Sequence, residues 1–467
     1  MTSEVYSNYK ESGSHWLGQI PSHWSVKKLK FLAVVQPSNV DKKTIDGEEP
    51  VLLCNYTDVY KNEYIDSRLE FMPATATSTE IEKFSTDIGD VIVTKDSEDP
   101  SDIAIPACIS EKIDGLLCGY HLTQIKPIGL DGRYLLRLFQ SKGFNAQFII
   151  SANGVTRFGL PQYAISNAYS CMPPMSEQKG IAKFLDFKTA QIDALISKQK
   201  ILLDKLAEKR TALISHAVTK GLDPSVPMKD SGVVWLGSVP SHWKRGVKLN
   251  YLAAQKRNSF VNGPFGSDLL SSELTDDGIP VIYSGDVKPN RFYRKSSSYV
   301  TTEKAEQLNF CRVDPGDLLL AKVGDPPGDA AIYPSDAPSG IVTQDVVRIK
   351  LNDEIVDTQY LTFLLNSTYG RFVVRTVSVE ATRGRFSLGD FKSLRFVMPP
   401  LHEQRQIVKI VVSHISPILN LEDKVIESIK KLQEYRSTLI TNAVTGKIDV
   451  RDFSIPENCE SQRAECA

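Results

Sequence analysis

Apolar residues recur at every seventh position in two separate stretches of the chain. These positions hold Leu185, Ile192, Gln199, Leu206 and Leu213 in the first stretch, and Val411, Ile418, Val425, Leu432 and Leu439 in the second. Companion apolar positions are Ile181, Leu195 and Leu202, then Ile407, Leu421 and Ile429. Charged residues fill most places in between, which is the pattern of an a/d seam between helices. We predict two helices of about forty residues, each about 60 Å long, that pair along this seam. Two separate bundles with ordinary core helices are the alternative.

Prolines mark where these helices begin. Residues 173–174 and 399–400 are Pro-Pro pairs directly before the two stretches, as expected of a helix start. Pro417 lies inside the second stretch, where it removes a backbone donor and crowds the preceding turn. Because Ser416 and Pro417 suit the N-cap and N1 positions, we predict a short helix followed by a long one, or a kink.

The chain also repeats itself. Residues 12–33 and 231–253 share the pattern WLG-x-(I/V)-PSHW and contain all four tryptophans. Residues 171–185 match 397–411, and 205–219 match 431–445, both at an offset of 226. Self-similarity of this kind indicates a tandem duplication of a unit of about 220 residues.

Between the matched ends lie two divergent segments, 34–170 and 254–396. Each has β-type runs punctuated by Gly and Pro, such as Asp90–Lys95 and Asp317–Lys322, followed by a helical stretch near Tyr134 or Tyr360. We predict one mixed α/β domain in each. The boundaries that follow are 1–33 (N-terminal repeated segment), 34–170 (first domain), 171–224 (central helix), 225–253 (second repeated segment), 254–396 (second domain), 397–450 (C-terminal helix) and 451–467 (a tail expected to be disordered).

Composition and charge exclude a single compact domain and a membrane-spanning segment, but they do not indicate a binding partner. The length of 467 residues is too great for one compact domain, and the net charge of −1 indicates neither a nucleic-acid-binding chain nor an acidic tail. The polar N-terminus is not a signal peptide, and no apolar run is long enough to span a membrane. Seven scattered cysteines without a CxxC pair fit reduced, buried or incidental thiols, so we expect a cytoplasmic protein.

The sequence offers no active site. It has no phosphate-binding GxxxxGK[ST] loop, no GxGxxG motif and no metal-ligand spacing. Asp325–Gly328 begins like an amino-methyltransferase motif but lacks the aromatic residue that stacks on a flipped base, so a turn is the better interpretation. For His23 and His242 in the repeated Pro-Ser-His-Trp we expect hydrogen-bonded structural roles. For the Glu-Gln pairs at 177–178 and 403–404 we expect helix capping or packing.

Taken together, the repeated phrases carry a family resemblance. WLG-x-(I/V)-PSHW, Gly-Pro-Phe-Gly-Ser-Asp-Leu at 263–269, MPP-x-x-EQ and the ALISHAVT or TLITNAVTGKID segments resemble the specificity subunit of type I restriction–modification systems. The resemblance extends from about residue 12 to 450. It implies an α+β fold in which two target-recognition domains form a tandem pseudo-twofold repeat, separated by two long antiparallel coiled-coil helices.

The resemblance also implies a function and partners. Each target-recognition domain would read one half of a split site in double-stranded DNA, and the helices would set the spacing and dock two methyltransferase subunits, which endonuclease/translocase subunits join. The chain itself would be non-catalytic. Adenine-N6 methylation and ATP-dependent cleavage, with S-adenosylmethionine, ATP and Mg²⁺, would belong to the partner subunits.

Local charge indicates where DNA would bind. Segment 34–170 holds 12 basic and 19 acidic residues, a net of −7, which argues against a broad phosphate-binding face. However, basic residues gather after the helical stretch of each domain. They are Lys126, Arg133, Arg137, Lys142 and Arg157 beside Phe158 in the first, and Arg371, Arg375, Arg383, Arg385, Lys392 and Arg395 in the second. Arginine suits guanine edges or phosphates; a solvated arginine beside a core Phe is the alternative for Arg157 and Arg385.

Three further groups are weaker candidates for DNA contact. Lys288, Arg291, Arg294 and Lys295 are interleaved with aromatic residues, although an ordinary surface hairpin fits as well. Gly263 and Phe265 lie in a tight loop that is equally consistent with a structural turn. Lys95 and Lys322 occupy matching positions and are as readily edge-strand lysines without a ligand.

Two other classes of function stay open at this point. A coiled-coil scaffold that binds only protein partners would suit the acidic first domain, and a self-sufficient enzyme is disfavoured by the missing cofactor motifs. Salt-dependent, sequence-dependent binding of duplex DNA by the assembled complex would exclude the scaffold.

Overall fold

The computed structural model describes residues 5–233, 235–324, 327–378 and 387–455. Its contacts divide the chain into two compact units. The first unit joins Met1–Gln199 to Ile426–Ala467, and the second unit is Lys200–Val425. Each unit therefore holds one α/β domain together with one half of each long helix.

The α/β domain of the first unit is built on two sheets. The five-stranded sheet has the order β4 (Ala33–Pro37), β12 (Leu122–Pro127), β8 (Val91–Thr94), β10 (Pro106–Ile109) and β6 (Tyr64–Ile65). The three-stranded sheet is β11 (Leu116–Cys118), β5 (Glu49–Cys54) and β7 (Met72–Ala76). Only the β10–β6 and β11–β5 pairs among these are parallel. The central strands β8 and β10 are buried along their whole length, which explains their continuous runs of apolar residues.

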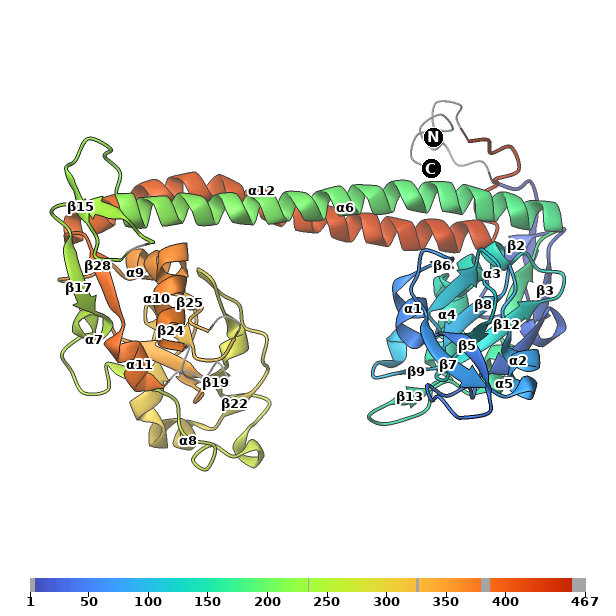
Figure 1. Ribbon diagram of the computed structural model, residues 1–467, viewed down its shortest axis with the longest axis horizontal. Helices are drawn as coiled ribbons and strands as arrows, with labels where there is room; N and C mark the ends of the chain where they lie inside the picture. Colours follow the sequence, from blue (N-terminus) through green and yellow to red (C-terminus); the bar gives the residue numbers. More distant parts are fainter. Residues whose placement is uncertain (1–4, 234, 325–326, 379–386, 456–467) are drawn as a thin grey trace. The chain divides into compact units, whose positions relative to one another are not determined.

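Short helices surround these sheets (Figure 1). They are α1 (Tyr56–Lys61), α2 (Ser78–Phe84), α3 (Gly132–Phe139), α4 (Lys142–Ile149) and α5 (Gln162–Asn167). Asp131 caps α3 by accepting hydrogen bonds from the N–H groups of Arg133 and Tyr134. The fully buried Tyr134 and Leu135 then anchor α3 in the core. The helical stretch predicted near Tyr134 is confirmed.

The second unit repeats this plan with different sheets. One has the order β18 (Phe260–Asn262), β27 (Val346–Ile349), β24 (Leu318–Ala321) and β25 (Ala330–Ile332). The other is β22 (Tyr299–Val300), β19 (Ile279–Ile282), β26 (Gly340–Val342) and β23 (Arg312–Val313). A hairpin of β20 (Val287–Lys288) and β21 (Arg291–Phe292) lies beside β25. The helices are α7 (Leu249–Leu252), α8 (Thr302–Gln307), α9 (Thr358–Asn366), α10 (Thr368–Ser378) and α11 (Leu388–Ser393).

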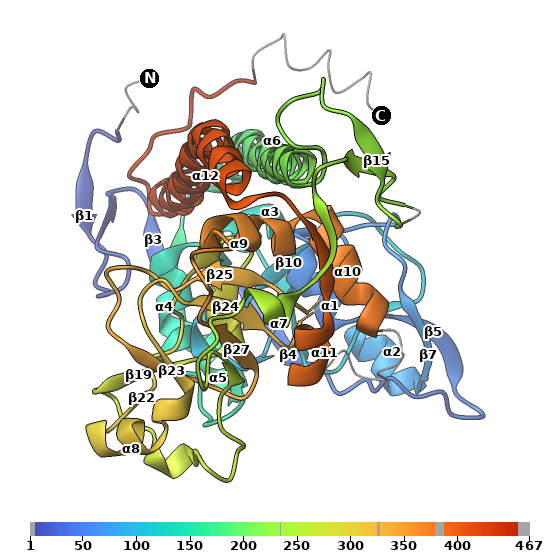
Figure 2. The same ribbon diagram turned by 90° about the vertical axis from the view of Figure 1, so that its left-hand side faces the viewer.

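Two long helices, α6 (Met175–Lys220) and α12 (Leu401–Val444), run side by side (Figures 1 and 2). In the first unit Gln199 donates a hydrogen bond to Ser428, and Arg436 donates to Asp193, so the helices are antiparallel there. In the second unit Arg210 pairs with Glu422 at 2.6 Å. Both helices begin directly after a Pro-Pro pair, which confirms the predicted start.

The helices meet along a seam with alternating steps of three and four residues. Its members, all buried or partly buried, are Leu185, Thr189, Ile192, Ile196, Gln199, Leu203, Leu206, Arg210 and Leu213 on α6, and Val411, Ile415, Ile418, Glu422, Val425, Ile429, Leu432, Arg436 and Leu439 on α12. The residues predicted at sevenfold spacing lie on this seam. Three predicted companions, Leu195, Leu202 and Leu421, are exposed instead. The predicted seam therefore has the wrong phase. The sevenfold positions occupy the d place of the heptad, so the other seam residue of each heptad lies four residues after them.

Pro417 does not divide the second helix, so the first of the two predicted alternatives, a short piece followed by a long one, is wrong. α12 is continuous through this residue, and the Ser416 hydroxyl donates back to the carbonyl of Val412 instead of capping a new helix. Pro417 and Ser413, whose carbonyl loses its helical partner, are both exposed. Water can therefore replace the missing hydrogen bond, so the helix tolerates proline on this face.

A repeated cluster joins each long helix to the segment before its domain. Glu177 of α6 accepts a hydrogen bond from the Trp24 indole and lies 2.7 Å from His23 Nε2. Glu403 of α12 makes the same contacts with Trp243 and His242. The neighbouring Gln178 and Gln404 accept from backbone N–H groups just before α3 and α9, and they donate to the Pro-Pro carbonyls. The structural roles predicted for these histidines and Glu-Gln pairs are confirmed.

The cysteines that the structure describes are free and buried. Burial raises the pKa of Cys108, Cys171 and Cys311 to about 12, so these thiols stay protonated and unreactive. Cys459 and Cys466 lie outside the described residues. Within the described ranges, no helix is long and apolar enough to cross a bilayer.

Candidate nucleic-acid interface

Three of the predicted DNA-contacting residues of the second domain line one hollow. The hollow has a volume of about 800 Å³, and its walls include Lys288, Arg371 and Arg375. Its fourth cation, Arg210 of α6, was not among the predicted DNA contacts. Asp329 is its one acidic lining residue within the described chain. The lining cations outnumber the lining carboxylate, and Arg210 is also paired with Glu422 of α12.

Local structure fixes these side chains. Arg371 and Arg375 lie four residues apart on α10, so they share a face of that helix. Arg371 forms an ion pair with Asp329 and a hydrogen bond of 3.3 Å with the Asn366 side-chain oxygen. Lys288 ends β20 and is exposed at the tip of the hairpin, where Asn290 adopts a left-handed φ of 61°. The hollow thus joins the hairpin, α10 and α6.

The other basic residues of the β20–β21 hairpin differ in exposure. Arg291 is largely exposed and lies 3.7 Å from Asp423 of α12. Lys295 is also exposed. Arg294 is partly buried, donates to the carbonyls of Ser296 and Ser298, and stacks over Tyr299 at 4.3 Å. These contacts engage the Arg294 guanidinium within the domain, whereas Lys295 is open to a ligand.

Gly263 and Lys322 serve the interior of the second domain. A Cβ added at Gly263 would lie 1.9 Å from the carbonyl oxygen of Val342, so glycine permits two backbone segments to touch. Lys322 is buried, and its ammonium donates to the carbonyl of Gln344. Phe265, by contrast, is exposed in the loop after Gly263. Of these three candidates, Phe265 alone presents a side chain to solvent.

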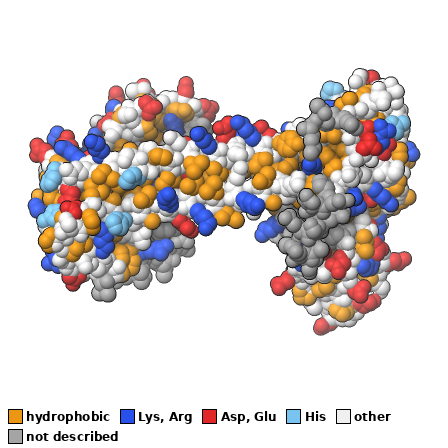
Figure 3. All heavy atoms as spheres, turned by 90° about the horizontal axis from the view of Figure 1, so that it is seen from above, with side chains coloured by type: hydrophobic (Ala, Val, Ile, Leu, Met, Phe, Trp, Pro, Cys, Tyr) orange, Lys and Arg blue, Asp and Glu red, His pale blue; other side chains and the backbone are white. Residues whose placement is uncertain are grey.

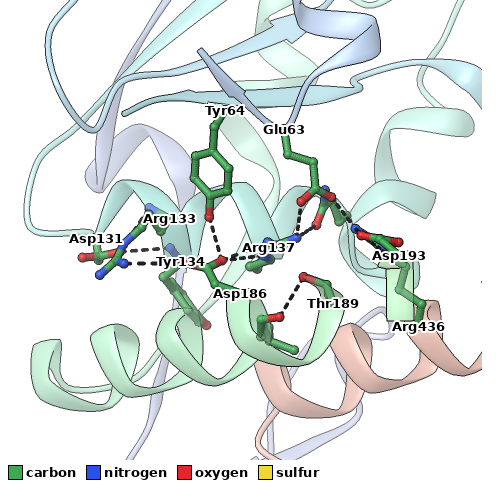
Figure 4. Close-up of polar contacts among 12 residues, drawn as sticks. Glu63, Tyr64, Asp131, Arg133, Tyr134, Arg137, Asp186, Thr189, Asp193 and Arg436 are labelled. Carbon is green, nitrogen blue, oxygen red and sulfur yellow. Dashed lines mark hydrogen bonds and ion pairs between the residues drawn. The ribbon is translucent and has the colours of Figure 1, made fainter. Parts of the chain in front are cut away.

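In the first unit, Arg137 lies at the centre of an ion-pair network (Figure 4). Its side chain is only 1% exposed and pairs with Glu63 and Asp186, each at 2.9 Å. Arg436 of α12 joins the network by pairing with Glu63 and Asp193. Burial and full pairing leave the Arg137 guanidinium no donor face toward a ligand, so the structure argues against its sequence-based assignment to DNA contact.

This network ties the first domain to both long helices. Glu63 comes from the loop before β6, Asp186 and Asp193 from α6, and Arg436 from α12 (Figure 4). Burial alone would raise the pKa of Glu63, but Arg137 and Arg436 outweigh it and hold that pKa below its ordinary value. Tyr64 adds a hydrogen bond of 2.6 Å to Asp186.

The remaining basic candidates near α3 and α4 are distributed around the first domain. Arg133 is half-exposed and lies 3.6 Å from Asp186. Lys126 donates to the carbonyl of Ser85. Lys142, at the start of α4, is exposed and lines a hollow of about 470 Å³ together with Lys61 and Arg436. Arg133 lines a second hollow of about 390 Å³ with Lys179 and Lys183, so Lys142 and Arg133 both face concave surfaces.

Arg157 and Phe158 lie at a small two-stranded sheet in another part of the first domain. Phe158 lies in β13 (Phe158–Gly159), which pairs with β9 (Asp96–Ser97), and packs partly against the core. Arg157 is more than half exposed and lies 3.7 Å from Asp96. Lys95, just before β9, donates to the carbonyl of Ser38 and lies over the Tyr120 ring. Lys95 and Arg157 each directly precede a strand of this sheet. Arg383 and Arg385, at the corresponding place of the second domain, lie outside the described residues.

Two arginines of the helix seam were not predicted as site residues. Arg210 and Arg436 occupy the same position of the repeat, at the offset of 226, and each lines the hollow beside its own domain. The sequence does show an arginine at the same position of both helices. Recognising it as a seam residue required the correct phase of the seam, and the predicted phase was wrong.

Large apolar side chains are exposed along both long helices. In the first unit they are Met175, Leu195, Ile426 and Tyr435, and in the second they are Ile201, Leu202, Ile410, Val412 and Leu421. Figure 3 shows apolar side chains gathered along the helices in the view from above. Exposed apolar patches of this kind mark protein interaction sites. Among the residues that the structure describes, no group of three His, Cys, Asp or Glu side chains is placed to hold a metal.

Comparisons with known proteins agree with this architecture. A family model for the type I restriction modification DNA specificity domain matches residues 266–431. The chain is 25% identical over 448 residues to a Methanocaldococcus jannaschii protein named as the MjaX specificity subunit of a type I restriction enzyme, covering 93% of this chain and 96% of the relative. It is 22% identical over 281 residues to the StySPI specificity subunit of Salmonella potsdam, covering 59% of this chain and 57% of the relative. A solved chain from work on complex assembly and conformational transition of the type I R-M system has a TM-score of 0.61 at 15% identity, covering 91% of this chain and 98% of that chain. This likeness confirms the predicted α+β fold class, with two mixed domains and long coiled-coil helices.

Proposed function

Because this chain belongs to the family of type I restriction–modification specificity subunits, we propose that its two α/β domains read the two halves of a bipartite site in double-stranded DNA. The observation that carries the proposal is the duplication itself. A repeated frame surrounds two domains whose sequences have diverged. A common frame suits a common task, while divergent domains suit two different half-sites.

The charge distribution supports particular DNA-contacting residues. In the second domain, Lys288, Arg371 and Arg375 share one hollow, with Lys295 and Phe265 exposed elsewhere. In the first domain, Lys142 and Arg157 keep exposed cationic groups. We propose that these side chains contact phosphates or base edges, since DNA affinity comes largely from cations placed against the backbone.

The long helices would supply the spacing and the assembly. Their exposed apolar residues support a second proposal, that they dock two methyltransferase subunits. Endonuclease/translocase subunits would join that core. Adenine-N6 methylation and ATP-dependent cleavage would then be carried by the partners, which would bind S-adenosylmethionine, ATP and Mg²⁺.

One preparation tests these statements together. The chain is co-expressed with its cognate methyltransferase chain, the mass of the complex is measured, and its binding to random and methylation-mapped duplexes is titrated at several salt concentrations. We expect two methyltransferase chains for each specificity chain, sequence-dependent binding, and no methyl transfer by the isolated chain. A 1:1 complex would contradict the docking proposal. Equal affinity for all duplexes, or no affinity, would favour a scaffold that binds only proteins, the function suggested by the net charge of −7 in segment 34–170.

A further inference from the structure

A strongly basic surface lies in the second unit, where the repeated frame meets the end of the α/β domain. It is a two-stranded ribbon of β17 (Lys244–Lys248) and β28 (Arg395–Met398), which we call the basic ribbon (Figure 1). Lys244, Arg245, Lys248 and Arg395 are all exposed on it. Together with Lys229 and Tyr251, the β17 residues line an open hollow of about 680 Å³.

The cations of the basic ribbon are crowded against one another. Lys248 lies directly opposite Arg395 in the strand register. Like charges in such a pair are destabilising, so the chain retains an unfavourable contact here. The strand pairing is irregular between Lys244 and Val247, and Gly246 has a positive φ of 69°. The Arg395 guanidinium donates a hydrogen bond to the Gly246 carbonyl there. This bond holds the guanidinium over the ribbon and does not neutralise it.

No ion pair within the described part of the chain neutralises these groups. None of the four ribbon cations forms an ion pair with a described carboxylate, and Arg245 bonds only the backbone carbonyl of Asp230. Glu403, the acid near the hollow, is engaged by His242 and Trp243. The ribbon therefore presents unneutralised positive charge to whatever binds it.

The repeat places a related ribbon in the first unit. There β3 (Ser25–Lys28) pairs with β14 (Tyr169–Met172), and Lys27 and Lys28 lie opposite Ser170 and Tyr169. An exposed aromatic residue follows each lysine-bearing strand, Phe31 at 69% exposure and Tyr251 at 63%. Because the lysine-bearing strands β3 and β17 belong to the repeated frame, we expect their ligand to be a feature that both halves of the target share.

We propose that the basic ribbon binds the phosphate backbone of duplex DNA without regard to base sequence; the inference rests on the proposed DNA-recognition function. Phosphates are the same beside any half-site, and exposed lysine and arginine side chains are the groups that contact them. A protein partner fits less well, since protein interfaces have an apolar core poor in charge. Among the described residues that line the hollow, Tyr251 is the one large apolar group that is exposed.

The test compares two double variants in the complex with methyltransferase subunits. Lys244→Gln with Lys248→Gln removes two ribbon charges. The matched control, Arg68→Gln with Lys112→Gln, removes two exposed cations that are already paired with Asp66 and Asp87. Each lost phosphate contact removes about 0.9 from the slope of log K against log salt, so the ribbon variant should bind about 60-fold more weakly at 0.1 M salt. The loss should be equal for specific and random duplexes, and the control should retain wild-type affinity.

A third variant separates binding from folding. Arg395→Tyr installs the residue that the first unit has at this position, Tyr169, and relieves the like-charge pair. We expect about eightfold weaker DNA binding at 0.1 M salt with unchanged or higher thermal stability. Unchanged binding in both ribbon variants would overturn the inference while leaving the proposed function intact. Loss of methyltransferase chains from the variant complex would identify the ribbon as a protein interface and also overturn it. Failure of the wild-type complex to discriminate among duplexes would instead refute the proposed function.

Discussion

At the scale of single residues, the two units pair the equivalent seam arginine with different carboxylates. In the first unit, Arg436 of the seam is bound by Glu63 and Asp193. In the second unit, the corresponding Arg210 is bound by Glu422 on the opposite helix. The positions of Asp186 and Asp193 are taken there by Val412 and Leu419. The first domain is thus fixed to the helices by ion pairs, while the hollow beside the second domain keeps an excess of cations.

Glu63→Gln tests how much this network contributes to stability. The substitution keeps the size of the side chain but removes the charge that balances Arg137 and Arg436. We expect a loss of about 1.5–3 kcal/mol in the free energy of unfolding, the usual cost of losing a hydrogen-bonded charge. Urea denaturation measures this. Glu70→Gln, an exposed glutamate of the same domain, should cost less than about 0.5 kcal/mol. An equal effect of both changes would show that the network adds nothing.

The same pair of proteins gives a pH dependence with a definite sign. The pKa of Glu63 is lower in the folded chain than its ordinary value. Such a carboxylate stabilises the fold above its unfolded pKa of about 4.3, and this contribution is lost as pH falls through the folded pKa. The stability difference between wild type and Glu63→Gln should therefore be constant near neutral pH and shrink only below about pH 4.

The basic residues could be identified from the sequence, but their burial and their ion-pair partners could not. Arg137 of α3 and Arg371 of α10 were both predicted to contact DNA, yet Arg137 is buried among carboxylates and Arg371 lines an open hollow. The difference comes from Glu63, which lies 74 residues before Arg137 in the chain. Contacts over such separations depend on how the sheets pack, and local pattern does not encode that. The roles of His23 and Glu177 were predictable because both recur in the repeated phrases.

At the scale of elements, the long helices show what periodicity determines and what it leaves open. The sevenfold spacing predicted the existence and approximate length of α6 and α12, and the Pro-Pro pairs predicted where they start. It did not give the phase, because apolar residues also stand at Leu195 and Leu202, outside the seam. An apolar residue on a helix can face its partner helix or another protein, and the sequence pattern is the same in both cases. The continuity of α12 through Pro417 was missed for a related reason, since the pattern does not show which face meets water.

Two neighbouring residues of α6 separate these roles. Ile192→Ala removes a buried seam side chain and should cost about 2–4 kcal/mol in the free energy of unfolding. Leu195→Ala, three residues away and half exposed, should change stability by less than about 0.5 kcal/mol but weaken retention of the methyltransferase chain. Chemical denaturation and co-purification measure the two effects. If Leu195→Ala destabilised the chain as much as Ile192→Ala, the exposed residues would belong to the fold and not to an interface.

At the scale of the whole molecule, the near-zero net charge is an average over unlike parts. An acidic first domain, a cationic hollow in the second, the basic ribbon and charged helices sum to −1. The proposed division of labour assigns base recognition to the domains and distance to the helices. Because each helix contributes to both units, its length is the natural variable by which the spacing between half-sites changes.

Inserting seven residues after Gln199 and seven after Val425 tests this division directly. One heptad in each helix preserves the seam and lengthens it by about 10 Å, the length of about three base pairs of DNA. We expect methylated adenines mapped in a host genome to keep both half-site sequences while the spacer between them lengthens. A matched insertion of seven residues into only one helix breaks the pairing and should abolish assembly. Altered half-site sequences in the double-insertion protein would show that the helices take part in base recognition, because a pure spacer changes the distance between readers and leaves the contacts of each reader with its bases unchanged.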